Sequence, residues 1–195
     1  MKIGSELEKA AEIILRGGLV IYPTETFYAL GANALNKEAV EKVFKVKKRS
    51  LSKPISVIIA NRTWLKELVV EIPEVAIALM EKFWPGALTI IFKANFKWPS
   101  NLTAGTGKVG IRLSSHPIAQ NLVSWVNVPI TATSANISGQ PPPSNVKSIS
   151  LNRINFIISG GSTPGDIPST IIDVTSIPPL ILREGAIKLR SPDLF

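Results

Sequence analysis

The amino-acid sequence predicts an α/β fold: a single domain, residues 1–195, with a twisted mixed sheet flanked by helices. Three observations support this prediction. Short apolar runs alternate with amphipathic segments along the first half of the chain, and strand-like runs then come closer together. Hydrophobic residues make up 45% of the chain, which is enough for a sizeable core. The proline run at 141–143 is short and apolar strands follow it, so we interpret it as a stiff loop within one domain.

The individual elements follow from apolar periodicity and from residues typical of helix ends. A helix is expected at 36–48, where Val40, Val43, Phe44 and Lys47 share a face. Other helices are expected at 5–16, after residue 61, from residue 73, and at 115–125, the last capped by Ser115. Strands are expected at 19–22, 55–59, 87–93, 109–113, 129–133, 154–158, 170–174 and 180–182.

Composition excludes several classes of protein. The chain has no cysteine, so disulfides and thiolate metal sites are ruled out. No apolar run approaches the roughly 20 residues of a membrane span, and acidic residues interrupt the N-terminus before a signal sequence forms. We therefore expect a cytoplasmic protein with no membrane partner. The formal net charge of +8 suggests a polyanionic ligand, such as nucleic acid or a nucleotide phosphate.

Positive charge is concentrated between residues 37 and 53, which hold seven cations against Glu38 and Glu41. One interpretation is a solvated helix face. The other is a loop that wraps around a triphosphate. Lys47, Arg49 and Lys53 lie where the predicted helix passes into a loop, and guanidinium groups bind phosphate in bidentate fashion.

One further motif follows a predicted strand, where α/β proteins place ligand sites, and another leads into a predicted strand. Thr24, Glu25 and Thr26 follow the first strand, although an ordinary turn explains them equally well. Lys108 is followed by valine and a strand, which excludes a phosphate-binding P-loop. Arg112 lies between apolar neighbours and, if buried, needs an anionic partner: either a structural carboxylate or a ligand carboxylate.

Three weaker motifs are the small polar loop at 131–141 and the segments 168–173 and 181–186. The single histidine, His116, has no second histidine or cysteine beside it in sequence, so we predict no metal site. A serine–histidine triad with Asp166 or Asp173 is conceivable, but no Gly-x-Ser-x-Gly motif exists, and a structural role for His116 is favoured.

Taken in order, these segments resemble the YrdC/TsaC family, the threonylcarbamoyl-AMP synthases. The similarity runs from about Gly17 to Gly185. It rests on Pro-Thr-Glu-Thr-Phe-Tyr-Ala-Leu-Gly (23–31), Lys-x-Arg (47–49), Trp-Pro-Gly-Ala-Leu-Thr (84–89), Gly-Ile-Arg-Leu (110–113), Ser-Ala-Asn-Ile-Ser-Gly (134–139), Ser-Thr-Ile-Ile-Asp (169–173) and Leu-Arg-Glu-Gly (182–185).

The resemblance implies a large basic cavity on the sheet. By this resemblance Arg112 holds the carboxylate of L-threonine, and Lys47 lies close to the phosphates of ATP. The residues implied around L-threonine are Thr24, Thr26, Arg112, Ser134 and Ser169. Those implied around ATP are Lys47, Arg49, Lys53, Lys108, Asn136, Ser144 and Arg183.

The implied activity is that of an L-threonylcarbamoyladenylate synthase, a nucleotidyltransferase that makes threonylcarbamoyl-AMP and pyrophosphate from L-threonine, bicarbonate and ATP. Mg²⁺ is expected to arrive with ATP, and the product to pass to a threonylcarbamoyl transferase complex that modifies tRNA. The sequence offers no obvious general base with a shifted pKa. Positioning of the substrates and neutralisation of their charge would therefore depend on Lys47, Arg49 and Arg112.

Two alternatives stay open. One is a module that binds double-stranded RNA or tRNA without catalysis. The other is carbamoyl-AMP chemistry of the hydrogenase-maturation kind, whose proteins carry acylphosphatase and zinc-finger regions not seen in this sequence.

The sequence also departs from the family pattern. Ile58 stands where longer members have a histidine that touches threonine, and Lys53 where they have asparagine. The sequence ends soon after Arg190, so the C-terminal domain of the longer branch is not expected.

Overall fold

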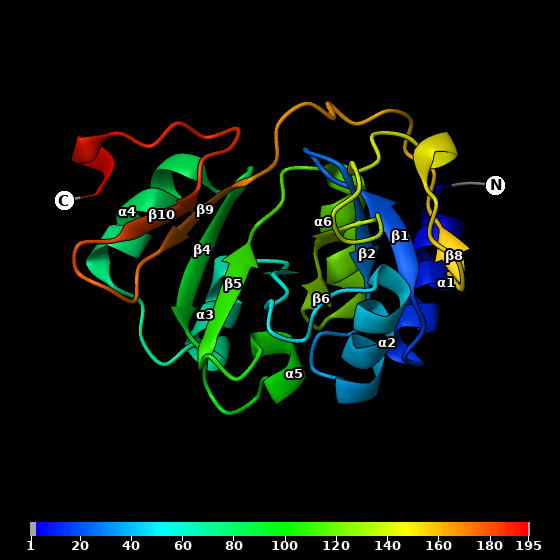
Figure 1. Ribbon diagram of the computed structural model, residues 1–195, viewed down its shortest axis with the longest axis horizontal. Coiled ribbons are helices and arrows are strands. Elements are labelled where there is room, and N and C mark those ends of the chain that lie inside the picture. The colour runs from blue at the N-terminus through cyan, green and yellow to red at the C-terminus, as the bar shows by residue number, and fades with distance from the viewer. Residues whose placement is uncertain (1–2, 195) are drawn as a thin grey trace.

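A computed structural model describes residues 3–194 and contains two mixed β-sheets with helices packed against them (Figure 1). The first sheet has the strand order β7-β2-β1-β8, formed by Thr133–Ser134, Tyr28–Gly31, Val20–Pro23 and Phe156–Ile157. The second has the order β10-β9-β4-β5-β3-β6, formed by Leu180–Arg183, Thr170–Asp173, Leu88–Lys93, Lys108–Arg112, Val57–Ile58 and Ile130–Thr131. The predicted α/β class with mixed pairing is confirmed, but the strands form two sheets where the sequence suggested one.

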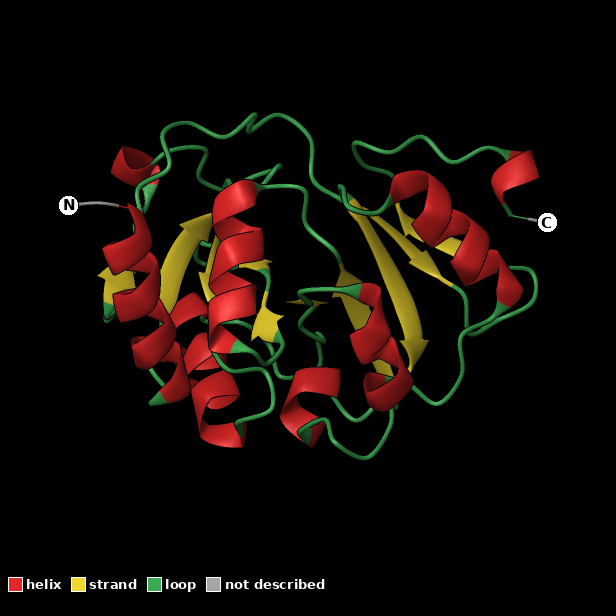
Figure 2. Ribbon diagram, turned by 180° about the vertical axis from the view of Figure 1, so that it is seen from behind, coloured by secondary structure: helices red, strands yellow, loops and turns green. Residues whose placement is uncertain are grey.

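The first sheet lies between helices on both of its faces. Because side chains alternate along a strand, Val20 and Tyr22 of β1 join one apolar cluster and Ile21 joins the other. The first cluster is completed by α1 (Ile3–Leu15) and α6 (Pro117–Val126), which pack side by side (Figure 2). The second is completed by α2 (Lys37–Lys47).

The second sheet has one apolar face and one polar face. Ile90 of β4 and Ile111 of β5 pair in register and pack with α4 (Glu74–Phe83). Their neighbours Thr89 and Arg112 point to the opposite face by the same alternation. This polar face is where the sheet meets the candidate site. The remaining helices are η1 (Arg62–Trp64), α3 (Leu65–Leu68), α5 (Ser100–Thr103), η2 (Val146–Ser148) and η3 (Ser191–Asp193).

Four local features differ from the sequence-based expectations. Strand β2 and helix α5 were not expected, because each is only four residues long and lacks a clear apolar period. Strand β3 is restricted to residues 57 and 58. His116, and not Ser115, caps α6: its ring Nδ1 accepts a hydrogen bond from the backbone N–H of Ile118 at 3.2 Å.

The long loops connect the two sheets. The segment that follows β8 crosses the top of the molecule before it enters β9 (Figure 1). The proline run is anchored to the first sheet, since the carbonyl of Pro143 accepts a hydrogen bond from the backbone N–H of Tyr28 at 2.9 Å. Within residues 3–194, no helix has the length and apolar character that crossing a membrane requires.

Candidate functional site

A cavity of about 390 Å³ lies where the polar face of the second sheet meets the loops of the first. Its walls carry three guanidinium groups and many small hydroxyl groups. The lining residues are Thr24, Thr26, Phe27, Tyr28, Ala29, Arg49, Pro54, Ile55, Ser56, Thr89, Arg112, Ala132, Thr133, Ser134, Asn136, Gln140, Pro142, Pro168, Ser169, Ile171 and Arg183.

The turn between β1 and β2 presents two buried threonine hydroxyls to this cavity. The Thr24 hydroxyl donates to the carbonyl of Phe27 at 2.7 Å and accepts from the backbone N–H of Thr26 at 3.2 Å. The hydroxyls of Thr24 and Thr26 are 3.0 Å apart. Such side-chain to backbone bonds fix a tight turn. The turn is therefore held in place before any ligand arrives.

Arg112 occupies the centre of the site. Its side chain is only 4% exposed, and its Nη1 lies 3.2 Å from Oε1 of Glu25 and 3.4 Å from the hydroxyl of Thr26. The Ser114 hydroxyl donates to the other Glu25 carboxylate oxygen. The anionic partner of Arg112 in this structure is thus a structural carboxylate. A guanidinium has five N–H donors, so Arg112 retains donors for a ligand carboxylate as well.

A second guanidinium, that of Arg183 on β10, is tied to Ser169. Its Nε donates to the Ser169 carbonyl at 2.9 Å, and its Nη2 donates to the Ser169 hydroxyl at 2.9 Å. That hydroxyl also lies 3.2 Å from the hydroxyl of Thr89. Burial lowers the pKa of Arg183, and the positive charge of Arg112 lowers it further. Two neighbouring cations of this kind favour an anionic ligand between them.

Gly185 allows the chain after Arg183 to pass close to the Ser169 backbone. A Cβ at this position would lie 2.3 Å from the Pro168 carbonyl and 2.5 Å from the Thr170 nitrogen. We predict that Gly185→Ala lowers the free energy of unfolding by about 1–3 kcal/mol, because backbone atoms must separate. Urea unfolding measures this effect. Gly4→Ala is a control for spacing, because nothing lies within 4 Å of its added Cβ and its φ is not in the left-handed region. An unchanged stability in Gly185→Ala would contradict the close approach.

Lys47 is buried beneath the loop that carries Ser134 and Asn136. Its ammonium donates to the Asn136 carbonyl at 2.7 Å and to the Ser134 carbonyl, and its own carbonyl accepts from the Ser138 N–H at 2.8 Å. The residue is 2% exposed and does not line the cavity. The implied contact of Lys47 with phosphate is therefore not what the structure shows. Lys47 anchors the 134–138 loop from behind.

Arg49 does line the cavity and holds the next loop in place. Its Nε donates to the Lys53 carbonyl at 3.0 Å and its Nη2 to the Pro54 carbonyl at 2.7 Å. Burial lowers the pKa of the Arg49 guanidinium. Arg49 therefore forms hydrogen bonds to the backbone of the same loop that was expected to wrap around a triphosphate.

The five residues predicted to surround L-threonine all line the cavity. Of the seven predicted around ATP, Arg49, Asn136 and Arg183 line it, whereas Lys47, Lys53, Lys108 and Ser144 do not.

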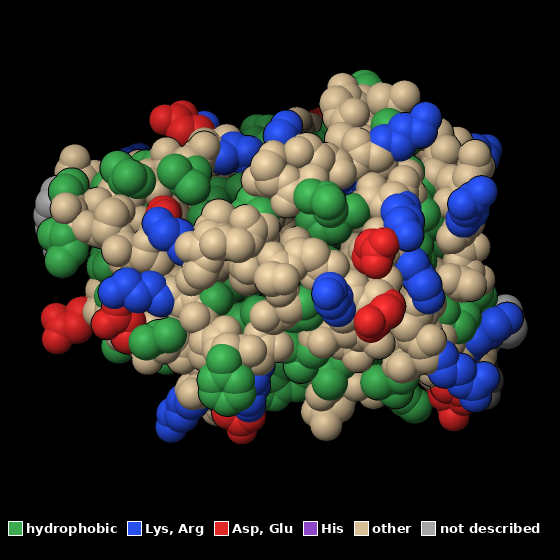
Figure 3. All heavy atoms as spheres, turned by 60° about the horizontal axis from the view of Figure 1, so that its bottom comes forward, with side chains coloured by type: hydrophobic (Ala, Val, Ile, Leu, Met, Phe, Trp, Pro, Cys, Tyr) green, Lys and Arg blue, Asp and Glu red, His purple; other side chains and the backbone are tan. Residues whose placement is uncertain are grey.

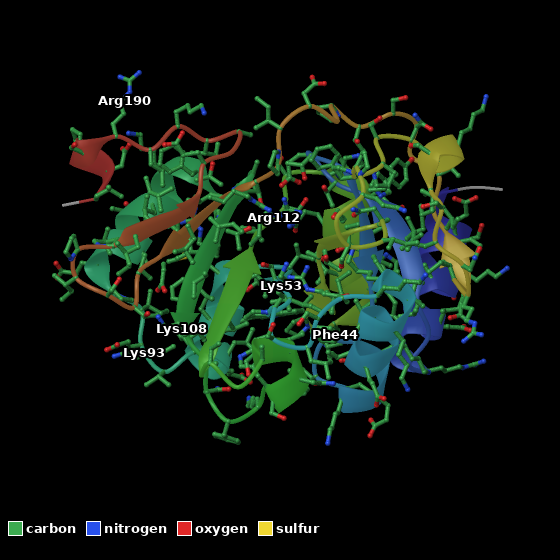
Figure 4. All side chains as sticks on the ribbon, viewed as in Figure 1. Phe44, Lys53, Lys93, Lys108, Arg112 and Arg190 are labelled. Atoms are coloured by element: carbon green, nitrogen blue, oxygen red, sulfur yellow. The ribbon has the colours of Figure 1, made fainter. Side chains whose placement is uncertain are left out.

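The four outliers are displaced for different reasons. Lys108 and Arg112 lie at opposite ends of β5, about 13 Å apart at the usual strand rise (Figure 4). There Lys108 forms an ion pair of 2.9 Å with Asp173. The Lys53 side chain is exposed. The carbonyl of Ser144 accepts two bonds from Thr163, which fold this part of the loop away from the cavity.

Sequence reasoning missed several wall residues. Thr89 belongs to the Trp-Pro-Gly-Ala-Leu-Thr motif, which was quoted without assigning a role to the threonine. Gln140 lies in the small polar loop at 131–141, which was singled out without a role for this residue, and Ser56 carried no signal of its own. Ile58, singled out as the place of a missing threonine contact, is fully buried in the apolar cluster beneath the sheet and does not line the cavity. Across residues 3–194, no three His, Cys, Asp or Glu side chains gather in a way that could hold a metal ion.

Comparisons with known proteins show which family this chain resembles. The family model Sua5_yciO_yrdC, described as telomere recombination, matches residues 12–185. The threonylcarbamoyl-AMP synthase of Pyrococcus abyssi is 42% identical over 183 residues, which cover 92% of this chain and 54% of that protein. A relative from Methanocaldococcus jannaschii is 35% identical over 187 residues, covering 94% of this chain and 87% of the relative. The crystal structure of P. abyssi Sua5 complexed with L-threonine has a TM-score of 0.90 and 41% identity, covering 93% of this chain and 54% of that one.

This chain therefore spans about half the length of the P. abyssi protein and most of the M. jannaschii relative. The family match covers most of the chain, the fold is shared, and the motifs of the family meet in one cavity. The chain belongs to the Sua5/YciO/YrdC family.

Proposed function

We propose that this protein is an L-threonylcarbamoyladenylate synthase, a nucleotidyltransferase that joins L-threonine, bicarbonate and ATP. One observation carries the proposal: the five residues assigned to L-threonine come from both sheets and line a single cavity. The similar P. abyssi protein has been crystallised with L-threonine, which supports the same ligand here.

The cavity suits an amino acid next to a nucleotide. The Arg112 guanidinium provides donors for the carboxylate of threonine, and the hydroxyls of Thr26 and Ser169 are within reach of its polar groups. Arg183, close to Ser169, extends the positive charge toward the phosphates of ATP. Arg49 and Asn136 complete the nucleotide side of the cavity. Buried guanidinium groups are strong ligands for carboxylate and phosphate.

The proposed reaction has two steps. The threonine amine attacks bicarbonate with loss of water, or CO₂ with release of a proton to solvent, to give an N-carboxylate. One oxygen of the N-carboxylate then attacks the α-phosphorus of ATP as pyrophosphate leaves. Among the described residues that line the cavity there is no Asp, Glu, His or Lys. The rate enhancement would then come from holding two anions together and neutralising their repulsion. Mg²⁺ bound to the ATP phosphates would add charge neutralisation, and the structure offers it no carboxylate cluster of its own within residues 3–194.

One assay tests the proposal. The protein is incubated with ATP, Mg²⁺ and labelled bicarbonate, with and without L-threonine. We expect threonine-dependent release of pyrophosphate and a labelled adenylate. Serine, which lacks the methyl group, is the matched control substrate, and we expect it to react more slowly by about 10–200-fold because one methylene-sized group is lost from the pocket. Pyrophosphate release that does not depend on threonine, or that requires carbamoyl phosphate, would contradict the proposal.

The product is a reactive mixed anhydride, so a second enzyme must consume it soon after release. We propose that this consumer is a threonylcarbamoyl transferase complex that modifies tRNA. A pull-down of the purified protein with such a complex tests direct contact between them.

A further inference from the structure

Glu25 belongs to a buried ion pair, and the proposed reaction assigns this carboxylate no role. Its side chain is 14% exposed, and that of its partner Arg112 is 5% exposed. Figure 3 shows acidic side chains beside Lys or Arg on the surface of the molecule. Ion pairs at such exposed positions include those of Glu41 and Glu67, whose side chains are 50% and 76% exposed. Because the burial of two charges has a large desolvation cost, the position of Glu25 calls for an explanation.

The Glu25 carboxylate is held between segments of the two sheets. Glu25 lies in the turn between β1 and β2 of the first sheet, whereas Arg112 ends β5 of the second sheet and Ser114 follows two residues later. The Ser114 hydroxyl is completely buried, donates to one oxygen of the carboxylate and accepts from the backbone N–H of His116 at 3.2 Å. The carboxylate therefore has a fixed position beside the guanidinium.

The ion pair leaves most of the N–H donors of Arg112 unused. Oε1 of Glu25 lies 3.2 Å from Nη1, but it accepts no hydrogen bond within residues 3–194. Among the described residues, the Arg112 side chain donates one hydrogen bond, to the Thr26 hydroxyl at 3.4 Å. A guanidinium has five donors, and Arg112 lines the cavity, where it lies between the two sheets (Figure 4). Glu25 thus restrains the guanidinium through charge and leaves free the donors that a ligand carboxylate needs.

Glu25 can act on a ligand only through Arg112. It does not line the cavity, whereas its neighbours Thr24 and Thr26 do. A carboxylate behind the guanidinium has two opposite effects on an anionic ligand in front of it. It fixes the orientation of the N–H donors, which favours correct placement of the ligand. It also repels the carboxylate of the ligand and offsets part of the arginine charge, which weakens binding.

We propose that Glu25 is a positioning residue, which aligns Arg112 for the reaction and at the same time lowers the affinity for the carboxylate-bearing substrate. The inference rests on the proposed function, because it takes L-threonine as the ligand of Arg112. Replacement of a residue that serves only to stabilise the fold impairs affinity and turnover together. Replacement of Glu25 separates the two, because its charge opposes binding while its alignment of Arg112 supports turnover.

Glu25→Gln tests the proposal, because glutamine keeps the shape of the side chain and removes its charge. Isothermal titration calorimetry measures the binding of threonine without ATP, and pyrophosphate release at saturating ATP and threonine measures kcat. We expect threonine to bind about three- to tenfold more tightly, because the guanidinium no longer has a competing anion beside it. We expect kcat to fall by about tenfold, less than the cost of about 10²-fold for a full misplacement of about 1 Å.

A second variant and a matched control accompany this substitution. Ser114→Ala keeps both charges and removes the hydroxyl that fixes the carboxylate, so threonine affinity should match wild type while kcat falls by a smaller factor than in Glu25→Gln. Asp193→Asn is the control, since its side chain is 6% exposed and forms an ion pair with Lys82, but does not line the cavity. It should leave threonine affinity and kcat unchanged. Thermal unfolding followed by circular dichroism shows which variants are folded at the assay temperature.

The outcomes separate this inference from the proposed function. In a wild type that binds and turns over threonine, weaker threonine binding or an unchanged kcat in Glu25→Gln overturns the inference alone. The same holds if Asp193→Asn behaves as Glu25→Gln does. If Glu25→Gln does not fold, Ser114→Ala decides the matter, and an unchanged kcat in that variant overturns the inference. A wild type that neither binds threonine nor releases pyrophosphate with it overturns the proposed function itself.

Discussion

Arg112→Met is expected to reduce threonine-dependent pyrophosphate release by about 10³-fold, the largest effect of any substitution in the cavity. Arg112 is the buried cation closest to the Thr26 hydroxyl, and no other described residue offers a guanidinium at that point of the wall. Loss of the guanidinium that holds the threonine carboxylate misplaces the amine, and a misplacement of about 1 Å typically costs 10²-fold in rate, to which the weaker binding of threonine adds. Steady-state release of pyrophosphate at saturating ATP measures the effect.

The substitution needs a structural control because Arg112 also neutralises Glu25. Oε1 of Glu25 is buried and has the guanidinium as its ion-pair partner, at 3.2 Å. Removal of one member of a buried pair typically costs about 3–5 kcal/mol. Arg112→Met/Glu25→Gln removes both charges, and we expect it to regain most of the unfolding free energy but none of the activity. Activity restored together with stability would show that Arg112 serves only to balance Glu25.

Lys47→Met is expected to lower kcat/KM for ATP by about 10²-fold, although Lys47 does not line the cavity. Its ammonium holds the carbonyls of Ser134 and Asn136, and a misplacement of about 1 Å in a site typically costs 10²-fold. Lys47→Arg is the discriminating variant. If Lys47 served as a phosphate ligand, arginine would preserve activity. If it anchors the loop from a buried position, the larger guanidinium does not fit, and activity should fall as in Lys47→Met.

The free energy of unfolding should depend on the protonation of Lys47, and therefore on pH. Burial, assisted by the charge of Arg49, lowers the pKa of Lys47 from its usual value near 10.5 to about 7. Between these values the unfolded chain binds a proton at Lys47 that the folded chain has lost, so the free energy of unfolding rises with pH across this window. Below pH 7 both states are protonated and the contribution is flat. Urea unfolding at a series of pH values should show this rise in wild type and not in Lys47→Met, and parallel curves would contradict it.

The sequence predicted those elements whose formation depends on local features, such as the spacing of apolar residues. The helix at 36–48 was predicted because Val40, Val43 and Phe44 recur on one face, and its left-handed end at Lys48 is visible only in the coordinates. Strand β2 escaped prediction because alanine and glycine, which strands disfavour, make up half of its four residues. The five threonine-site residues followed from a family resemblance, since spacing alone left each motif open to an ordinary turn.

Side-chain direction separated the residues predicted around ATP that line the cavity from those that do not. Lys47 and Arg49 stand two positions apart in one motif, at the end of α2. The Lys47 side chain lies beneath the 134–138 loop, whereas the Arg49 side chain lines the cavity. Lys108 and Arg112 share one face of β5, yet the length of the strand carries Lys108 to an ion pair with Asp173. The position of these side chains depends on where the backbone carries them and not on their residue type. The motif alone therefore does not predict it.

By itself, the sequence determined the α/β class, the mixed order of strands, the family, and the presence of cations for an anionic ligand. These follow from local periodicity, composition and ordered motifs. The division of the strands into two sheets, the pairing of Arg112 with Glu25 and the hydrogen bonds from Lys47 to the 134–138 loop were decided only by tertiary structure. Each depends on which segments distant along the chain come within a few ångströms of one another, and contacts of that kind leave no pattern in the sequence of a single chain.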